Sequence, residues 1–336
     1  MLPSMSQAEP GQPCAVPRPN HVPLAEQTRD GLVESVHYGS LIALDYDGGT
    51  RLSAGDPLAL FYPRSSLKPL QAVAMVRAGL DLPPDLLALA AASHSGSGEH
   101  QEGAVRILQL HGLTEAALEN TVDLPYGDAE RQSWLRAGGE ASQLAQNCSG
   151  KHAAMAATCV INGWPVAGYL DPEHPLQVAI AAVVLELTGE ESPLTSTDGC
   201  GTPLFALTLR GMARAFGRLA SARPDTAEAA VANAMMAHPE QVAGAGRDVT
   251  ALMRLVPGLL AKDGFEGLQL VGLRDGRAVA VKISDGADRA RMPVTLQTLA
   301  ALGLDGGLLQ TLAPAPVLGG GRPVGELRAI DFSTSN

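Results

Sequence analysis

Strand patterns stand at both ends of this 336-residue chain, and helical patterns fill the stretch between them. Residues 32–52 (LVESVHYGSLIALDYDGGTRL) predict a β-hairpin that turns at Asp47-Gly48-Gly49, because Asp-Gly pairs favour hairpin turns. Near the other end, residues 267–273 and 277–283 predict a second pair of strands, and a last strand is expected near 323–331. This order argues against a regularly alternating βαβ fold. It predicts an α+β protein whose N- and C-terminal strands meet in one antiparallel sheet.

Between the strands, apolar residues recur with helical spacing. A helix is expected from Ser66 onward, after a short third strand at PLALFYP. Further helices are expected at 84–92, 100–111, 129–137, 151–161, 175–188, 203–220, 226–237, 247–254 and 293–302.

These elements predict one domain over residues 21–336, preceded by a mobile tail at residues 1–20 that is rich in Pro, Gly, Ser and Gln. Within the domain, a sheet lobe would take about 21–65 and 262–331, and a helical lobe about 66–261. A functional site is expected between the lobes, where ligand sites often lie.

Composition narrows the function classes. The net charge is −11, and no Lys/Arg cluster is present, which argues against a nucleic-acid-binding protein. No apolar run approaches the ~20 residues that span a bilayer, and the first residues lack a signal-peptide pattern. We therefore expect a cytoplasmic protein without a membrane partner. The four cysteines are too sparse for a disulfide framework, so reduced thiols are expected.

Lysine is scarce in this chain: 20 of the 24 basic residues are arginine. One of the four lysines, Lys68, follows Ser65 by three residues in RSSLKP, where a helix is expected to begin. A neutral lysine can take the proton of a serine hydroxyl, which arginine cannot do. That role requires the pKa of the lysine to fall from about 10.4 toward ~7 through burial or a nearby cation. Chance alone gives roughly 0.2 such S-x-x-K matches in this chain, so a purely structural interpretation stays open.

Two other stretches could contribute to the same chemistry. The loop ASHSGSGEH includes Ser93, which either binds substrate and moves protons or simply belongs to a turn rich in small polar residues. In AKDGFEG, Lys262 comes just before the returning strands, where it could point into the cleft or lie in solvent. The fourth lysine, Lys282, alternates with Val281 and Ile283 and is expected in solvent.

Two cysteine motifs suggest a metal. QNCSGKHAAM contains Cys148 and Lys151, and TSTDGCGTP contains Asp198 and Cys200. Two thiols with an unusual lysine ligand could hold zinc, whereas spacing alone favours a pair of small buried thiols.

Taken together, these motifs resemble a known family. RSSLKP, ASHSGSGEH, NCSGKHAAM, YLDPEHPLQ, STDGCGTP, AKDGFEG and VKISDGADRAR occur in the order found in bacterial L-asparaginases of the Rhizobium-type class, and the resemblance runs from about residue 20 to residue 331. It implies a fold like that of serine β-lactamases and penicillin-binding proteins, hydrolysis of the side-chain amide of L-asparagine, and a homodimer.

The resemblance also implies roles for individual residues. It pairs Ser65 with Lys68 and Ser93 with Lys262 as the catalytic groups. It assigns zinc to Cys148, Lys151 and Cys200, and it puts Arg64, His152 and Asp198 near the substrate or the metal. On this basis the zinc interpretation replaces the buried-thiol interpretation.

One departure from the family pattern is expected to affect specificity or affinity. Ser97 and Gly98 stand where the family usually has Glu-Pro, and the stretch between Lys68 and Ser93 is slightly shorter. Two alternatives to asparagine hydrolysis remain. The first is a β-lactam-hydrolysing or penicillin-binding relative, although the S-D-N and K-T-G motifs are missing. The second is a non-catalytic amino-acid-binding protein. Glutamine is a further possible substrate, because one methylene gives only about 1–3 kcal/mol of discrimination.

Overall fold

The computed structural model describes residues 17–331. The strands are β1 (Val22–Arg29), β2 (Leu32–Leu44), β3 (Thr50–Ala54), β4 (Leu60–Phe61), β5 (Thr195–Thr197), β6 (Pro203–Phe205), β7 (Leu207–Thr208), β8 (Leu259–Gly264), β9 (Leu268–Leu273), β10 (Ala278–Ile283), β11 (Val317–Gly319), β12 (Arg322–Gly325) and β13 (Leu327–Ala329). The α-helices are α1 (Lys68–Arg77), α2 (Pro84–Ala90), α3 (Gly98–Leu110), α4 (Asp128–Arg136), α5 (Ser149–Asn162), α6 (Pro175–Thr188), α7 (Leu209–Ala220), α8 (Ala227–Ala237), α9 (Pro239–Val242), α10 (Asp248–Leu255), α11 (Arg291–Ala301) and α12 (Gly306–Gln310). Short 3-10 turns are η1 (Arg64–Leu67), η2 (Glu115–Ala117) and η3 (Asp288–Ala290).

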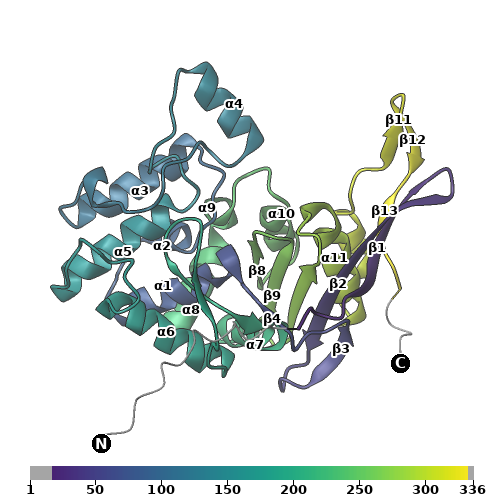
Figure 1. Cartoon of the computed structure of the whole chain (residues 1–336), viewed down its shortest axis with the longest axis horizontal. Helices are drawn as coiled ribbons and strands as arrows, with labels where there is room; N and C mark the ends of the chain where they lie inside the picture. Colours follow the sequence, from purple (N-terminus) through teal and green to yellow (C-terminus); the bar gives the residue numbers. More distant parts are fainter. Residues whose placement is uncertain (1–16, 332–336) are drawn as a thin grey trace, which may run out of the picture.

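The main sheet joins the two ends of the chain, as predicted. Its strand order is β13-β1-β2-β10-β9-β8, with β3 also paired to β2, and the pairings are antiparallel. The hairpins β2–β3 and β9–β10 form at the predicted turns. The α+β class with an antiparallel sheet from both termini is therefore confirmed (Figure 1).

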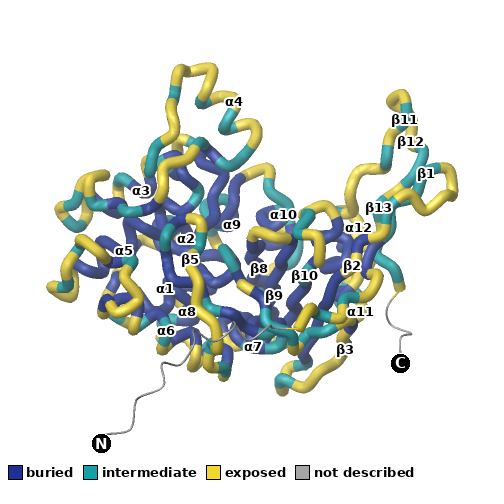
Figure 2. Tube along the Cα trace, viewed as in Figure 1, coloured by how far each residue is buried: buried dark blue, intermediate teal, exposed yellow. Residues whose placement is uncertain are grey.

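Helices cover the middle of this sheet. Helices α7 and α11 both pack on β9 and β10. Strands β8 and β9 are buried at every position and β10 at all but one, which requires cover on both faces. The same burial appears as a dark blue centre in Figure 2. The apolar residues that predominate in these strands thus follow from two-sided packing, whereas half-exposed strands alternate.

The remaining helices form a second layer beside the sheet. Helix α1 lies at its centre, in contact with α2, α5, α6 and α8, and its residues 68–75 are all buried. Figure 1 shows this helical group on one side and the sheet on the other, with β8 and β9 nearest to the helices. Because η1 and α1 run next to β8, the start of α1 lies where the two groups meet.

Several local predictions are wrong. Strand β1 was not expected, although it pairs with both β2 and β13. The helix predicted at 203–220 begins only at Leu209, because residues 203–208 form β6 and β7 and Thr208 caps the helix. The strand predicted at PLALFYP is limited to Leu60–Phe61 and pairs with β7 instead of the main sheet.

Two lysines also differ from expectation. Lys262 lies within β8, completely buried, and not before the strand. Lys282 is half-buried in β10 instead of lying in solvent. Of the predicted tail at residues 1–20, residues 1–16 and with them Cys14 lie outside the described residues.

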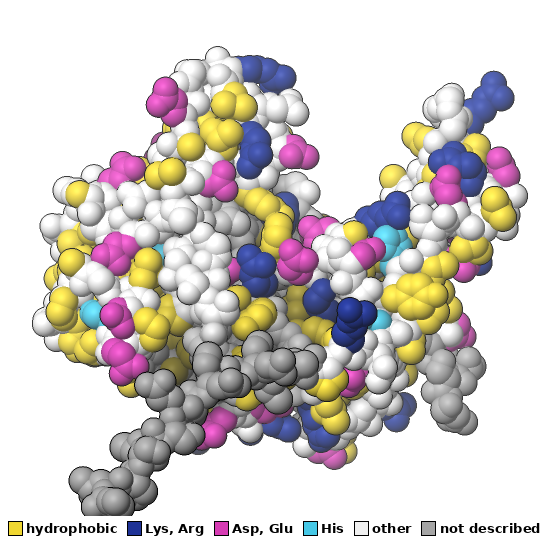
Figure 3. Space-filling view, viewed as in Figure 1, with side chains coloured by type: hydrophobic (Ala, Val, Ile, Leu, Met, Phe, Trp, Pro, Cys, Tyr) yellow, Lys and Arg dark blue, Asp and Glu magenta, His cyan; other side chains and the backbone are white. Residues whose placement is uncertain are grey.

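No helix in the described part of the chain is long and apolar enough to cross a membrane. On the face drawn in Figure 3, acidic and basic side chains are interspersed.

Candidate functional site

A pocket of about 290 Å³ opens where the helical group meets the sheet. Ser65, at the start of η1–α1, and Ser93, in the loop after α2, both line it. Arg64 lines it beside Ser65, and the other lining residues come from five further segments: Thr121, Asp123, Tyr126, Arg131, Gln146, Asn147, Cys148, Asp198, Gly199, Cys200, Asp263, Gly264, Phe265 and Asp288. The pocket therefore collects residues that are far apart in sequence, as expected for a site between two layers.

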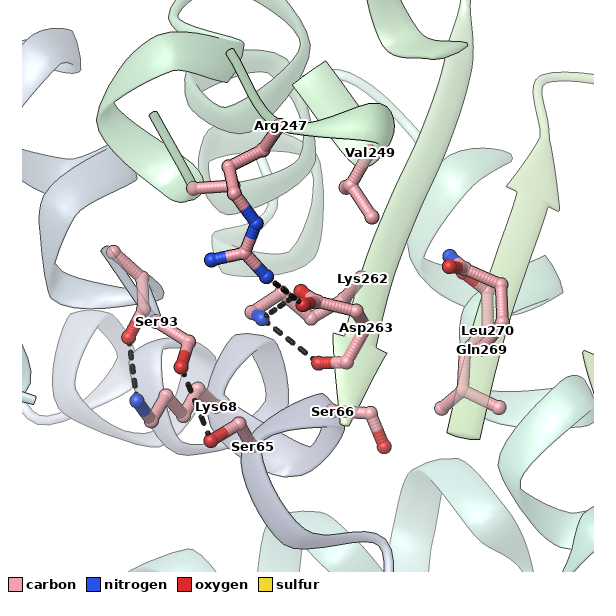
Figure 4. A network of polar contacts seen from close by, with 12 residues as sticks. Ser65, Ser66, Lys68, Ser93, Arg247, Val249, Lys262, Asp263, Gln269 and Leu270 are labelled. Atoms are coloured by element: carbon pink, nitrogen blue, oxygen red, sulfur yellow. Dashed lines mark hydrogen bonds and ion pairs between the residues drawn. The ribbon is translucent and has the colours of Figure 1, made fainter. Parts of the chain in front are cut away.

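The two serine hydroxyls are in contact inside this pocket. Ser93 Oγ donates a hydrogen bond to Ser65 Oγ at 3.3 Å (Figure 4). The side-chain amide of Asn147 donates to Ser93 Oγ at 3.1 Å. Ser93 is thus oriented toward Ser65, and the hydroxyl pair can pass a proton between the two oxygens.

The backbone around Ser65 is held in an unusual conformation. Arg64 has φ = +50°, a region that non-glycine residues seldom adopt. Ser66 fixes the turn by donating its hydroxyl to Pro63 O at 2.7 Å. The end of β8 approaches closely, since a Cβ added at Gly264 would lie 2.6 Å from Pro63 O. Glycine at 264 thus permits the contact that places Ser65 beside the end of β8.

The loop that holds Ser93 is hydrogen-bonded on both sides. Its backbone N–H donates to Val242 O, and that of Ser95 donates to Ala243 O. On the other side His94 N donates to Asn147 O. This extended segment therefore has little freedom, which fixes the position of the Ser93 side chain relative to Asn147.

Lys68 is buried at the base of the pocket, with 1% of its surface exposed. Its amine donates to Ala92 O at 2.7 Å and to Cys148 Sγ at 3.1 Å. Among the described residues, neither this amine nor that of Lys262 hydrogen-bonds a serine hydroxyl directly. In Figure 4 the two amines lie on either side of the serine pair.

Lys262 is fully buried and is held by its neighbour Asp263. The amine donates to the carboxylate of Asp263 at 2.6 Å and to its backbone oxygen at 2.8 Å. Burial lowers the pKa of Lys262 to about 8, opposed by Asp263 and assisted by the nearby Lys68. A substantial fraction of this amine is consequently neutral near pH 8 and able to accept a proton.

Asp263 itself bridges two cations. Besides Lys262 it accepts a hydrogen bond from Arg247 at 2.6 Å. Burial alone would raise the pKa of Asp263, but Lys262, Arg247 and Arg291 hold it well below its usual range. The carboxylate is therefore charged at any physiological pH and determines the direction in which Lys262 points.

The two cysteines from separate motifs meet behind the serine pair. Cys148 and Cys200 are 3% and 2% exposed. A hydrogen bond between their thiols raises the pKa of Cys148 and lowers that of Cys200, so the pair favours one thiolate. The Lys151 amine donates to Cys200 Sγ at 3.1 Å and to Thr202 at 3.0 Å. Helix α5 can bring Lys151 here because a Cβ at Gly150 would lie 2.7 Å from Leu89 O.

These donors fit a zinc ion. Zn²⁺ takes thiolate and neutral nitrogen ligands, usually four. The Nε2 atom of His152 is buried without a hydrogen-bond partner and lies beside Cys200. Its Nδ1 contacts Tyr169 Oη at 2.8 Å, and burial lowers the pKa of His152 to about 4, which keeps the ring neutral. Among the described residues, no three or more His, Cys, Asp or Glu side chains form a group suited to a metal. The two thiols would therefore need the amine of Lys151 as a further ligand.

Arg64 and Asp198 stand together at the pocket wall. Arg64 Nε donates to Asp198 Oδ1 at 2.7 Å, and the guanidinium lies 5.2 Å from the centre of the Phe265 ring. Both groups line the pocket, so either can meet the charged groups of an amino acid. His152, by contrast, does not line the pocket and lies behind it, against the thiols.

Sequence reasoning missed three residues of the site: Asn147, Asp263 and Arg247. Asn147 and Asp263 were already inside motifs that had been singled out, each next to a predicted site residue. Arg247 carried no sequence signal. The departing pair Ser97-Gly98 begins α3, where Ser97 caps the helix, and it lies outside the pocket lining.

A family comparison agrees with these motifs. The family model described as L-asparaginase II matches residues 25–329. This chain belongs to the L-asparaginase II family. No curated protein matches it.

Solved structures with some similarity are hydrolases. A putative β-lactamase from Bacteroides dorei shares 15% identity, covers 78% of this chain and 93% of its own, and has a TM-score of 0.42. A β-lactamase from Mycobacterium bovis shares 15% identity over 74% and 88%, with a TM-score of 0.32. EstCE1, a hydrolase with promiscuous acyltransferase activity, shares 13% over 83% and 92%, with a TM-score of 0.38. Because these TM-scores are low, the family assignment depends on the family model alone.

The buried charge on Asp263 gives a stability prediction. Asp263→Asn leaves Lys262 and Arg247 without their carboxylate, and we expect the free energy of unfolding at pH 7 to fall by roughly 3 kcal/mol. Since the folded pKa of Asp263 is depressed, its stabilising contribution is present above the unfolded pKa of about 3.9 and is lost as pH falls below it.

Urea denaturation at pH 7 and at pH 3 measures this, and the two proteins should differ less at the lower pH. Asp275→Asn is a matched control, because Asp275 pairs with Arg277 while half exposed and should contribute little. Equal effects of the two substitutions would contradict the prediction.

Proposed function

We propose that this protein hydrolyses the side-chain amide of L-asparagine to L-aspartate and ammonia. The observation that carries the proposal is the contact between Ser65 Oγ and Ser93 Oγ in a small pocket, beside a buried lysine whose pKa lies near 8. Membership of the L-asparaginase II family supports the substrate class.

In the proposed mechanism, Ser65 Oγ attacks the amide carbon while Lys68 takes the hydroxyl proton. The tetrahedral intermediate collapses when the amide nitrogen receives a proton through Ser93, and ammonia leaves. Ser93 regains its proton from the amine of Lys68, which thus passes on the proton that it took from Ser65. Water then attacks the acyl ester at Ser65, neutral Lys262 accepts the proton of that water through Ser93, and this proton returns to Ser65 Oγ as aspartate leaves.

The roles of the two serines can also be reversed, since each hydroxyl lies within reach of the other. An electrophile derived from asparagine, followed by peptide mapping, distinguishes the two arrangements. An adduct on Ser65 supports the stated order, and one on Ser93 the reversed order. Labelling of neither serine would contradict covalent catalysis.

Arg64 and Asp198 are proposed to hold the α-carboxylate and α-ammonium groups of the substrate. Their mutual ion pair keeps both side chains directed at the pocket before substrate enters. Phe265 packs beneath the guanidinium and limits its motion. The homodimer and the cytoplasmic location implied by the family resemblance stay predictions.

Removing either hydroxyl should abolish turnover. Ser65→Ala and Ser93→Ala are each expected to lower kcat for ammonia release from asparagine by at least about a thousandfold, as loss of a catalytic hydroxyl does elsewhere. Ser53→Ala is the control: Ser53 is an exposed serine in β3 and does not line the pocket.

Asparagine, glutamine and the chromogenic β-lactam nitrocefin should be assayed side by side. Turnover of nitrocefin without ammonia release from either amino acid would contradict the proposed substrate. Thermal stabilisation by asparagine without ammonia release would instead indicate a binding protein.

The lowered pKa of Lys262 predicts a pH dependence. Only the neutral amine can accept the proton of the attacking water, so kcat for asparagine should rise with pH and level off above about 8. The charged groups that face Lys262 are Asp263, Lys68 and Arg247, and of these Asp263 opposes the shift. Lys262→Met should remove this rise together with most of the activity. A profile that is flat between pH 7 and pH 9 in the wild type would contradict the role of Lys262.

We also propose that Cys148, Lys151 and Cys200 hold zinc, with His152 as the remaining nitrogen donor. Zinc there would supply a Lewis-acidic centre and tie helix α5 to the loop that holds Cys200. The purified protein should contain about one zinc per chain by elemental analysis. Cys200→Ser should lose that zinc and unfold at a lower temperature, whereas Cys159→Ser should keep it. Equal zinc contents in these two variants would contradict the assignment.

A further inference from the structure

Lys282 is the one lysine that the proposed mechanism does not use. It lies in β10, paired with Ser40 of β2 and Leu268 of β9. Its neighbours Val281 and Ile283 are buried, whereas Lys282 itself is half-buried. Its amine donates a hydrogen bond to Ile283 O, and it forms no ion pair with any described residue. No carboxylate of the described residues lies within ion-pair distance of this amine, although Glu266 and Asp285 act on it from farther away, and such a half-buried ammonium group is costly.

The amine of Lys282 faces a second pocket of about 350 Å³. The lining of this pocket combines apolar surface, to which Leu204 contributes, with polar groups: Tyr62, Ser196 and Thr197, whose hydroxyls can donate or accept hydrogen bonds, and the charged residues Arg64, Glu266 and Lys282. A concave surface with several convergent polar groups is the kind of surface that binds a small polar molecule.

This second pocket adjoins the serine pocket. Arg64 lines both. Two further segments supply neighbouring residues to the two pockets: Asp198 and Phe265 line the serine pocket, and the adjacent Thr197 and Glu266 line the second one. The ion pair of Arg64 with Asp198 thus stands between the two spaces, and a ligand that passes Arg64 would reach Lys282.

The charges indicate what such a ligand carries. Arg64 is the group at the boundary that attracts the carboxyl end of a bound amino acid. In a chain extended from that end, the α-carboxylate becomes a peptide carbonyl, which can still accept a hydrogen bond from Arg64, and the chain's own carboxylate would reach Lys282. Burial lowers the pKa of Lys282, with Glu266 and Asp285 acting against this shift, and a bound carboxylate would add to their effect.

We propose that the pocket around Lys282 binds a carboxylate one residue beyond the asparagine site. This inference depends on the proposed function for the identity of the first residue. The carboxylate belongs to a dipeptide that begins with asparagine, or to a separate small carboxylic acid bound next to the amino acid.

Binding measurements test the proposal without turnover. The probes are the dipeptide Asp-Gly, which is the product that hydrolysis of Asn-Gly would give, and Asp-Gly amide, which lacks the terminal charge. Calorimetry with the wild-type protein should show at least tenfold tighter binding of Asp-Gly than of its amide. Lys282→Met should abolish this preference, and Lys282→Arg should retain part of it.

Arg322→Met is the matched control, because Arg322 is an exposed cation on β12 that lines neither pocket. A preference that survives in Lys282→Met, or that is missing in the wild type, would overturn the proposal. Folding of each variant is checked by its thermal unfolding. If Lys282→Met folds poorly, the comparison of Asp-Gly with its amide in the wild type and in Lys282→Arg decides.

The two sources of the carboxylate are separated by N-acetylglycine added to protein saturated with aspartate. Lys282-dependent binding of this acid assigns the pocket to a separate molecule, and binding of the dipeptide alone assigns it to an extended substrate.

Ammonia release from asparagine is measured in parallel. If it is absent while Asp-Gly binding depends on Lys282, the proposed function fails and the carboxylate site stands. If ammonia release is normal while Asp-Gly and its amide bind equally well, the carboxylate site fails and the proposed function stands.

Discussion

The rest of the site depends on amines that are held inside the protein. Lys68, Lys151 and Lys262 are each at most 1% exposed, and removing an ammonium group from water costs several kcal/mol unless partners compensate. Their hydrogen-bond partners differ: Lys262 donates to a carboxylate, Lys151 to a thiol and a hydroxyl, and Lys68 to a backbone carbonyl and a thiol. Each amine is therefore fixed in direction by those partners.

This burial links the serine pair to the thiol cluster. Asn147 donates its amide hydrogen to Ser93 and accepts a hydrogen bond from Cys148 at 3.1 Å. Cys148 Sγ in turn accepts from the amine of Lys68. A change at the thiols, such as binding of a metal, would reach Ser93 through a single side chain.

The position of the site follows from the two-layer architecture. Ser65 comes from the turn that enters the helical group, while Lys262 and Asp263 end the edge strand β8 of the sheet. The contact between Gly264 and Pro63 brings these two parts together at the floor of the pocket. On the other side of Arg64, strand β10 of the same sheet presents Lys282, so one ion pair separates two pockets of comparable size.

The sequence by itself determined the α+β class, because strand patterns at both ends and helical periodicity between them leave few other arrangements. It also singled out Ser65 with Lys68 and the two cysteine motifs, since their spacing is local. Only the tertiary structure decided that Asp263 restrains Lys262, that Asn147 joins Ser93 to Cys148, and that Lys282 is half-buried beside Arg64. These are contacts between distant segments or consequences of burial. A local sequence pattern does not show which other segment of the protein will pack against it.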